Sequence, residues 1–240
     1  MINPLKLGKR AYRHDPRRRA LAALVLPKLP LPPESRDWTN GHPAWGMMRN
    51  DVEGDCVFAG GGHIIQVATL QATDAMVTPP DEQIEAMYEQ WAGFKPDDPA
   101  TDNGFVEADF LNLWEQQGYC GFKLLGHVDV NPANLTHVKQ ASAFFGPLKI
   151  GANLPVSAQS QTLWDVAIDD GGLWGGHDMT LAAYDKAGPL LITWGAVQRA
   201  TWAWWLKYVD ECHALLLEVW EQRFPSAGSD VLQRILKAVA

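Results

Sequence analysis

The order of its secondary-structure patterns most limits the folds open to this chain. Helix signals occupy the first half, at residues 56–73, from Asp81 onward, at 107–117 and from Asn131–Pro132 onward. Short apolar runs bounded by Gly or Pro follow at residues 148–154, 178–184, 190–194 and 212–219, with further helix patterns at 202–209 and 230–239. The spacing of apolar residues predicts helices in the first set and strands in the apolar runs. Helices followed by strands indicate an α+β protein with a helical half and a sheet half.

Three consecutive glycines, Gly60 to Gly62, interrupt the predicted helix at residues 56–73. Each costs a helix about 1 kcal/mol relative to alanine. We therefore expect another part of the protein to pack very close to the backbone of this helix.

Composition excludes several classes of protein. The chain has 240 residues, 47% hydrophobic and 20% charged, which suits one large globular domain. The sequence shows neither a run of about 20 apolar residues nor a signal peptide with a small-residue cleavage site. It therefore predicts no membrane partner, and it predicts a cytoplasmic or virion location. The three cysteines lie outside any CxxC motif, which favours a reducing compartment. Without an HExxH motif or a closely spaced Cys/His set, neither a metal nor a cofactor is predicted.

Residues 1–44 read as an extended basic and proline-rich arm, ahead of a domain at residues 45–240. Seven of the first 19 residues are Lys or Arg against one acid, whereas the whole chain carries a net charge of −8. An acidic body repels phosphate, so nucleic acid is not expected as a partner. The arm is either a solvated tail or a docking segment for a protein assembly or another copy of this chain.

Cys56 is the candidate nucleophile. It opens the helix at residues 56–73, where the helix dipole and free N–H groups favour thiolate, and Gly54 permits the tight turn before it. His177 is the candidate base, because it enters an apolar strand after Gly175 and Gly176. Alone, either residue also fits a structural role, as a small buried hydrophobe or a satisfied core histidine.

Four motifs in the same order resemble the papain-like cysteine peptidases. Asn50 stands six residues before Cys56, where that family has glutamine, and Gly54 stands two before it. His177-Asp-Met and then Ile192-Thr-Trp-Gly195 follow the pattern of the family's histidine strand and its Asn-Ser-Trp-Gly segment. The resemblance covers residues 45–219, and residues 146–155 are similar to the family's strand ahead of the histidine.

The resemblance implies a papain-like fold, in which a central helix bearing Cys56 packs in a helical half against an antiparallel sheet half. It implies a thiol hydrolase of peptide or other amide bonds with a peptide or protein substrate. Cys56 would attack, His177 would move the proton, and Asn50 with the Cys56 N–H would hold the oxyanion.

One departure weakens this expectation. Aligning Trp194 with the family's tryptophan places Ile192 at the asparagine that orients the histidine, and isoleucine cannot bond an imidazole. Thr193 or Asp178 are candidate substitutes, and an Ile192→Asn change is expected to raise activity. The alternative is an inactive papain-fold building block, for example a component of a phage particle docked through its arm. A transglutaminase-like or acetyltransferase-like thiol enzyme fits the motif order less well.

Overall fold

The computed structural model describes residues 5–13 and 30–223 of the chain, so the helix predicted at 230–239 lies outside the described residues. The helices are α2 (Cys56–Thr73), α3 (Asp81–Ala92), α4 (Glu107–Gln117), α5 (Leu135–Phe145), α6 (Trp202–Tyr208) and α7 (Glu218–Arg223), with 3-10 turns at Pro99–Thr101 and Val156–Gln159. The strands are β1 (Arg36–Asp37), β2 (Leu124–Asp129), β3 (Leu148–Pro155), β4 (Leu163–Trp164), β5 (Leu173–Tyr184), β6 (Pro189–Thr193), β7 (Ala196–Ala200) and β8 (Val209–Leu217). Within the described part of the chain, no helix combines the length and apolar character that crossing a membrane requires.

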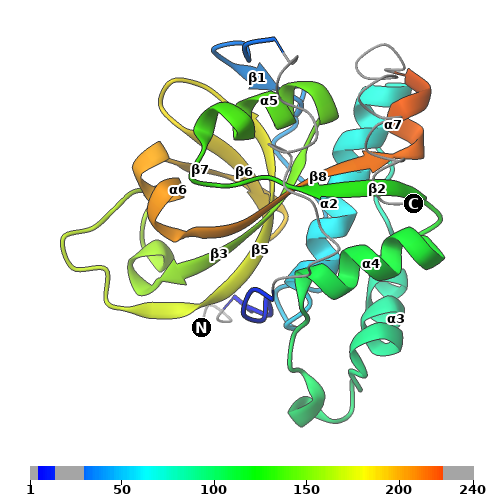
Figure 1. The fold of residues 1–240 in the computed structure, drawn as a ribbon. Helices are drawn as coiled ribbons and strands as arrows, with labels where there is room; N and C mark the ends of the chain where they lie inside the picture. The colour runs from blue at the N-terminus through cyan, green and yellow to red at the C-terminus, as the bar shows by residue number, and fades with distance from the viewer. Residues whose placement is uncertain (1–4, 14–29, 224–240) are drawn as a thin grey trace.

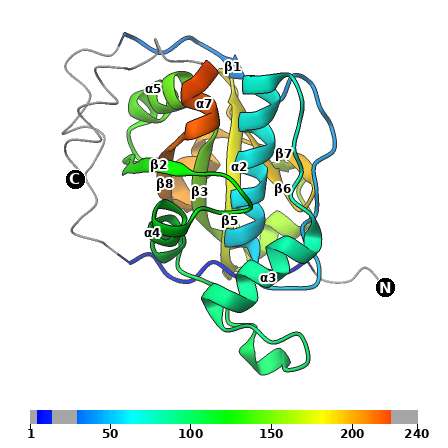
Figure 2. The same ribbon diagram turned by 90° about the vertical axis from the view of Figure 1, so that its right-hand side faces the viewer.

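The elements form the two halves that the sequence predicts (Figure 1). Helices α2, α3 and α4 lie on one side of the molecule, and the strands follow on the other. Figure 2 shows α2 running the height of the molecule directly in front of the sheet. The α+β assignment is therefore confirmed, and so are the helices predicted at residues 56–73 and 107–117.

A single mixed sheet organises the second half. Its strand order is β2-β8-β3-β5-β6-β7-β4, with β1 paired to β5. Neighbouring strands are antiparallel except for the short β4–β7 pair. The long strand β5 lies at the centre, and its residue His177 pairs with Ala152 of β3.

Hydrophobic cores lie on both faces of this sheet. On one face α2 packs with a group of aromatic side chains that includes Phe58, Phe110 and Tyr119. On the other face α5 and α6 cover the strands, and Trp204 and Trp205 of α6 are fully buried. The central strands are therefore buried on both sides, which fixes the position of β5 relative to α2.

The glycines of α2 lie where other groups approach the helix backbone closely. A Cβ on Gly60 would come within 1.9 Å of the Asp178 Oδ1 atom on β5. A Cβ on Gly61 would lie 2.5 Å from the Phe110 ring, and one on Gly62 would lie 2.2 Å from the Met48 sulfur. The predicted close packing is confirmed, and at Gly60 it brings β5 directly against the helix.

The start of α5 differs from the prediction. Asn131 and Pro132 suggest a cap and a first helical residue, but the helix begins at Leu135 after the N-cap residue Asn134. The Asn134 side chain accepts from the His137 N–H at 3.2 Å, whereas the Asn131 side chain accepts from Ala133 within a preceding turn. Either asparagine can accept a backbone N–H that follows it closely, in a turn or as a helix cap, so the sequence alone did not discriminate between them.

Parts of the first 44 residues contact the body of the same chain. Arg36 and Asp37 pair with the end of β5, and Trp38 belongs to the α2 core. Residues 5–10, which we call the strap, lie in dark blue across the foot of α2 (Figure 2).

Candidate active site

Cys56 is the first residue of α2 and is completely buried. The turn before it is held by Asp102, whose carboxylate accepts the Gly54 N–H at 2.9 and 3.1 Å. The sulfur of Cys56 accepts the backbone N–H of Asp178, with a nitrogen-to-sulfur distance of 3.4 Å. The start of α2 therefore touches β5 one residue beyond His177.

His177 is buried on β5 and held by two residues that follow β5 in sequence. Its Nε2 atom lies 2.6 Å from the Thr193 hydroxyl oxygen. The Trp194 ring stacks on the imidazole, with ring centres 4.0 Å apart and planes 14° apart. These contacts fix the plane of the ring and give one of its nitrogens a hydrogen-bond partner.

Ile192 does not face this histidine. Successive side chains of a strand point to opposite faces, so Thr193 and Ile192 cannot both reach His177. Ile192 is fully buried in the hydrophobic cluster around α2. The alignment on Trp194 thus marked the wrong residue as the partner of the histidine, and Thr193, named as a candidate substitute, makes the contact.

Asn50 lies in the turn that leads to Cys56 and is buried. One of its amide hydrogens is directed to the Glu53 carbonyl oxygen, at a nitrogen-to-oxygen distance of 3.3 Å. Glu53 in turn accepts from Arg49 at 2.7 and 2.9 Å, which fixes the turn. The Asn50 side chain is thus engaged within this turn, by Glu53 and by the Asp55 carboxyl group.

The strap pairs with both halves of the molecule. On the sheet half, the Lys9 N–H donates to Gly176 O at 3.1 Å. On the helical half, Phe105 N–H donates to Gly8 O at 2.8 Å, and Arg10 N–H donates to Phe105 O at 2.9 Å. The bridge between Lys9 and Phe105 is parallel. The strap therefore spans the junction between the halves through an isolated β-bridge and these backbone hydrogen bonds.

The strap lies directly over the candidate nucleophile. A Cβ on Gly8 would come within 1.6 Å of the Gly54 carbonyl oxygen, so only glycine permits this approach. The Gly8 backbone N–H faces the Cys56 sulfur and favours its ionised form. The Trp194 indole N–H donates to Lys6 O at 3.1 Å, so the ring that covers His177 also holds the strap.

Lys9 anchors the strap in the interior. Its ammonium nitrogen lies 2.8 Å from Glu211 Oε1 and 3.0 Å from Asp210 Oδ1, and its side chain is fully buried. Burial alone would lower the pKa of Lys9, but the charges of Glu211 and Asp210 outweigh it and raise that pKa. Because the ion pair is buried, breaking it from one side would leave a carboxylate without its partner, which is costly.

In this conformation the Cys56 thiol and the His177 imidazole are both held neutral. Burial, followed by the negative charge of Asp178, raises the pKa of the Cys56 thiol to about 12. Burial, followed by the positive charges of His63 and Lys149, lowers the pKa of His177 well below its ordinary value. A thiolate–imidazolium pair is therefore disfavoured while the strap is in place.

Other residues considered for chemistry have structural positions. His63 is buried and its Nε2 atom contacts Gly46 O at 2.8 Å. Cys212 is buried in the sheet core, and Cys120 is half-buried beside the aromatic cluster on α2.

Comparison with known proteins finds similarity in three-dimensional structure but not in sequence. No model of a known protein family matches the chain. No curated protein matches it in sequence. Xylellain, a cysteine protease from Xylella fastidiosa, superposes with a TM-score of 0.67 and 13% sequence identity. The superposition covers 90% of this chain and 97% of xylellain. The chain has the papain-like fold.

Two further cysteine proteases support this assignment of the papain-like fold. A procathepsin B from Trypanosoma congolense superposes with a TM-score of 0.58 and 10% identity, over 89% of this chain and 87% of its own. A cysteine protease of Carica candamarcensis gives a TM-score of 0.55 and 12% identity, over 77% of this chain and 98% of its own. At these identities the shared property is the papain-like fold, which the sequence motifs correctly predicted.

The main feature that the sequence did not reveal is the position of the strap. Lys6 to Arg10 look like part of a basic tail, and no pattern in them specifies a partner. Two of these residues matter by type: Gly8, because only glycine can pass so close to Gly54, and Lys9, because its ammonium pairs with buried acids.

Proposed function

We propose that this chain is a papain-like thiol hydrolase of peptide or other amide bonds, kept latent by its own strap. One observation carries the proposal most strongly. The Asp178 N–H donates to the Cys56 sulfur, so a cysteine at a helix N-terminus lies beside the strand that carries the stacked and hydrogen-bonded His177. A helix N-terminus favours thiolate, and an adjacent imidazole supplies the base.

The chemistry begins when the strap leaves and a substrate takes its place over Cys56. His177 accepts the thiol proton as the sulfur attacks the acyl carbon. The Cys56 backbone N–H and the Asn50 amide, once it turns from Glu53 and Asp55, are the proposed donors to the oxyanion. His177 returns the proton to the leaving amine, and water then hydrolyses the thioester with His177 again as base.

Thr193 and Trp194 take the positioning role in this proposal. A hydroxyl can accept from the imidazole N–H and so select one tautomer, as the third group of a catalytic triad does. The stacked indole keeps water from one face of the ring. A hydroxyl bears no charge, so we expect weaker activity than a full triad provides.

An inactive papain-fold building block is the second candidate. It is favoured by the same strap, which covers the buried Cys56 and leaves the thiol and imidazole neutral. In this case the strap never leaves, and Cys56 stays inaccessible to alkylating reagents in every variant that folds.

The decisive experiment displaces the strap with one methyl group. Gly8→Ala introduces a Cβ 1.6 Å from Gly54 O, so the strap cannot remain in place. We expect Cys56 to react with iodoacetamide at least about tenfold faster than in the parent, because the thiol becomes accessible and its pKa falls. Hydrolysis of a fluorogenic peptide library should appear in the same variant.

Two variants control this test. Arg10→Ala changes an exposed side chain of the strap and should leave the alkylation rate unchanged. Cys56→Ala in the Gly8→Ala background should abolish hydrolysis. Fast alkylation without hydrolysis in Gly8→Ala would reject the hydrolase, and unchanged alkylation in a folded Gly8→Ala protein would reject the latent strap as well.

A further inference from the structure

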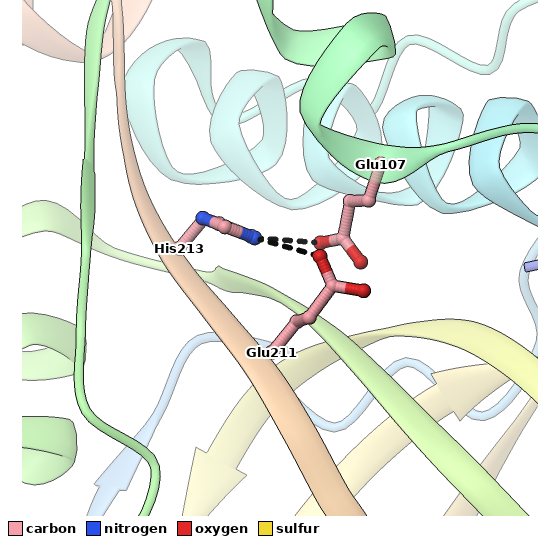
Figure 3. A group of neighbouring side chains, drawn as sticks. All are labelled: Glu107, Glu211 and His213. Atoms are coloured by element: carbon pink, nitrogen blue, oxygen red, sulfur yellow. Dashed lines mark ion pairs between the residues drawn. The ribbon is translucent and has the colours of Figure 1, made fainter. Parts of the chain in front are cut away.

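A buried cluster outside the candidate active site brings together two carboxylates and an imidazole. Glu107 begins α4, and Glu211 and His213 lie two positions apart on β8, so both project from the same face of that strand. Figure 3 shows the three side chains converging. One ligand atom from each lies within 4.8 Å of the others, and all three residues are buried.

The distances in this cluster suit a shared cation better than direct hydrogen bonds. The His213 Nε2 atom lies 3.5 Å from Glu107 Oε1 and 3.6 Å from Glu211 Oε2. Charge-assisted N–H···O bonds are about 2.7–2.9 Å long. By contrast, two ligands of a tetrahedral Zn²⁺ at about 2.0–2.2 Å each lie roughly 3.3–3.6 Å apart.

The carboxylate of Glu107 gives an independent indication that a cation suits this cluster. Glu107 is fully buried, and no N–H donor among the described residues bonds its carboxylate oxygens; its side chain shares a hydrogen bond with another acid, Asp178. Figure 3 shows this carboxylate directed at His213 and Glu211. Burial, followed by the charges of Asp178 and Glu211, raises its pKa well above the ordinary value. A cation at this point would satisfy the group.

His213 is oriented as metal-binding histidines usually are. Its Nδ1 atom lies 2.8 Å from Asp129 Oδ1, so this nitrogen carries the proton shared with the carboxylate. When the imidazole is neutral, its lone pair therefore lies on Nε2, which faces the two glutamates. A carboxylate on the far nitrogen fixes the tautomer and raises the basicity of the ligating nitrogen.

We propose that Glu107, Glu211 and His213 form a binding site for a divalent transition-metal ion such as Zn²⁺. Two carboxylates and one imidazole are a donor set that this class of ion accepts, with a water molecule as the fourth ligand. Glu107 is far in the sequence from Glu211 and His213, so no spacing motif reveals the site.

The Lys9 ammonium would compete with the metal ion for Glu211. This ammonium contacts Glu211 Oε1 at 2.8 Å and brings a positive charge from the strap into the same cluster. A divalent ion bound by Glu211 repels this ammonium, so metal binding and strap docking oppose one another. Such coupling is reciprocal: removing the ammonium strengthens metal binding.

The test is a Zn²⁺ titration of the full chain in competition with a chromogenic chelator. Cys56→Ser is the common background, so that the thiol cannot bind the metal. Lys9→Met keeps the length of the side chain and removes its charge, and we expect one Zn²⁺ per chain with at least tenfold tighter binding than in the background protein. Adding Asp129→Asn to Lys9→Met should weaken binding by about 10–100-fold, the usual effect of removing the group that orients a ligand.

Ligand and control variants decide the assignment. Glu107→Gln and His213→Gln, each combined with Lys9→Met, should lose the tight site. Glu82→Gln is the matched control, because Glu82 is exposed on α3, outside the cluster, and should not affect binding. Co²⁺ should show the visible absorption of a tetrahedral site in Lys9→Met and lose it in the Glu107→Gln combination. Equal Zn²⁺ affinity with and without Glu107, or no binding by Lys9→Met at a large excess of Zn²⁺, would overturn the proposal.

Discussion

The Thr193 hydroxyl oxygen lies 2.6 Å from Nε2 of His177. This contact replaces the asparagine contact expected from the papain-like resemblance, and it comes from the residue next to the one that the alignment indicated. Thr193 and Ile192 are neighbours on β6 and therefore face opposite sides of the sheet. Thr193 therefore orients the histidine, and Ile192, which the alignment matched to the family's asparagine, packs in the core.

Removing the Thr193 hydroxyl should lower activity without unfolding the protein. Thr193→Val keeps the shape of the side chain, and in the Gly8→Ala background we expect a loss of roughly 10–100-fold in kcat, because the imidazole loses the partner that fixes its tautomer. Thr193→Ser retains the hydroxyl and should keep most of the rate. The kcat, the KM and the pH profile should be measured for all three proteins; equal rates for Val and Ser would exclude a positioning role for the hydroxyl.

Ile192→Asn should destabilise the protein rather than restore a triad. The side chain is fully buried on the α2 face, so an amide there loses apolar packing and gains no ready partner. We expect a loss of about 2–4 kcal/mol in the free energy of unfolding, against about 0.5–1.5 kcal/mol for Ile192→Val. Urea unfolding measures both. A gain in hydrolysis by the Asn variant would show that Ile192 does face the catalytic base.

The pH dependence of Cys56 alkylation should distinguish the closed from the open site. With the strap docked, burial holds the pKa of the thiol at about 12, above its ordinary value of 9.0. The rate in the parent should therefore keep rising above pH 9, whereas the rate in Gly8→Ala should level off at a lower pH. The raised pKa also means that the buried thiol contributes stability below pH 9, and that this contribution is lost as the pH rises toward 12. Identical pH profiles for the two proteins would contradict this account.

Gly60→Ala should be destabilising although alanine is the better helix former. Its Cβ would lie 1.9 Å from Asp178 Oδ1, and Asp178 is itself fixed by Lys149, whose ammonium lies 2.7 Å from the same oxygen. The propensity gain of about 1 kcal/mol is therefore outweighed by an overpacking cost of about 1–3 kcal/mol. Thermal unfolding should show a lower Tm, and a Tm equal to or above that of the parent would mean that β5 can move away from α2.

The sequence predicted most of the fold but less of the site, for physical reasons. Helix α2 was predictable from its own apolar residues and from the glycines that mark its close contact with β5. The start of α5 was not, because Asn131 and Asn134 can both bond a following backbone N–H, and Asn131 does so in a turn while Asn134 caps the helix. Thr193 could be named as a candidate partner of His177, but only the strand register decides which neighbour faces the ring. The strap and the Glu107–Glu211–His213 cluster depend on long-range contacts, for which no local pattern exists.

The strap belongs to the same chain as the site that it covers. A tethered segment meets its target at an effective concentration on the order of millimolar, whatever the concentration of the protein itself. If the strap acts as proposed, dilution cannot release it, and a peptide substrate must outcompete a ligand that never diffuses away. The specific activity of a purified sample would then measure an internal equilibrium between covered and uncovered molecules, rather than the intrinsic rate of the catalytic residues.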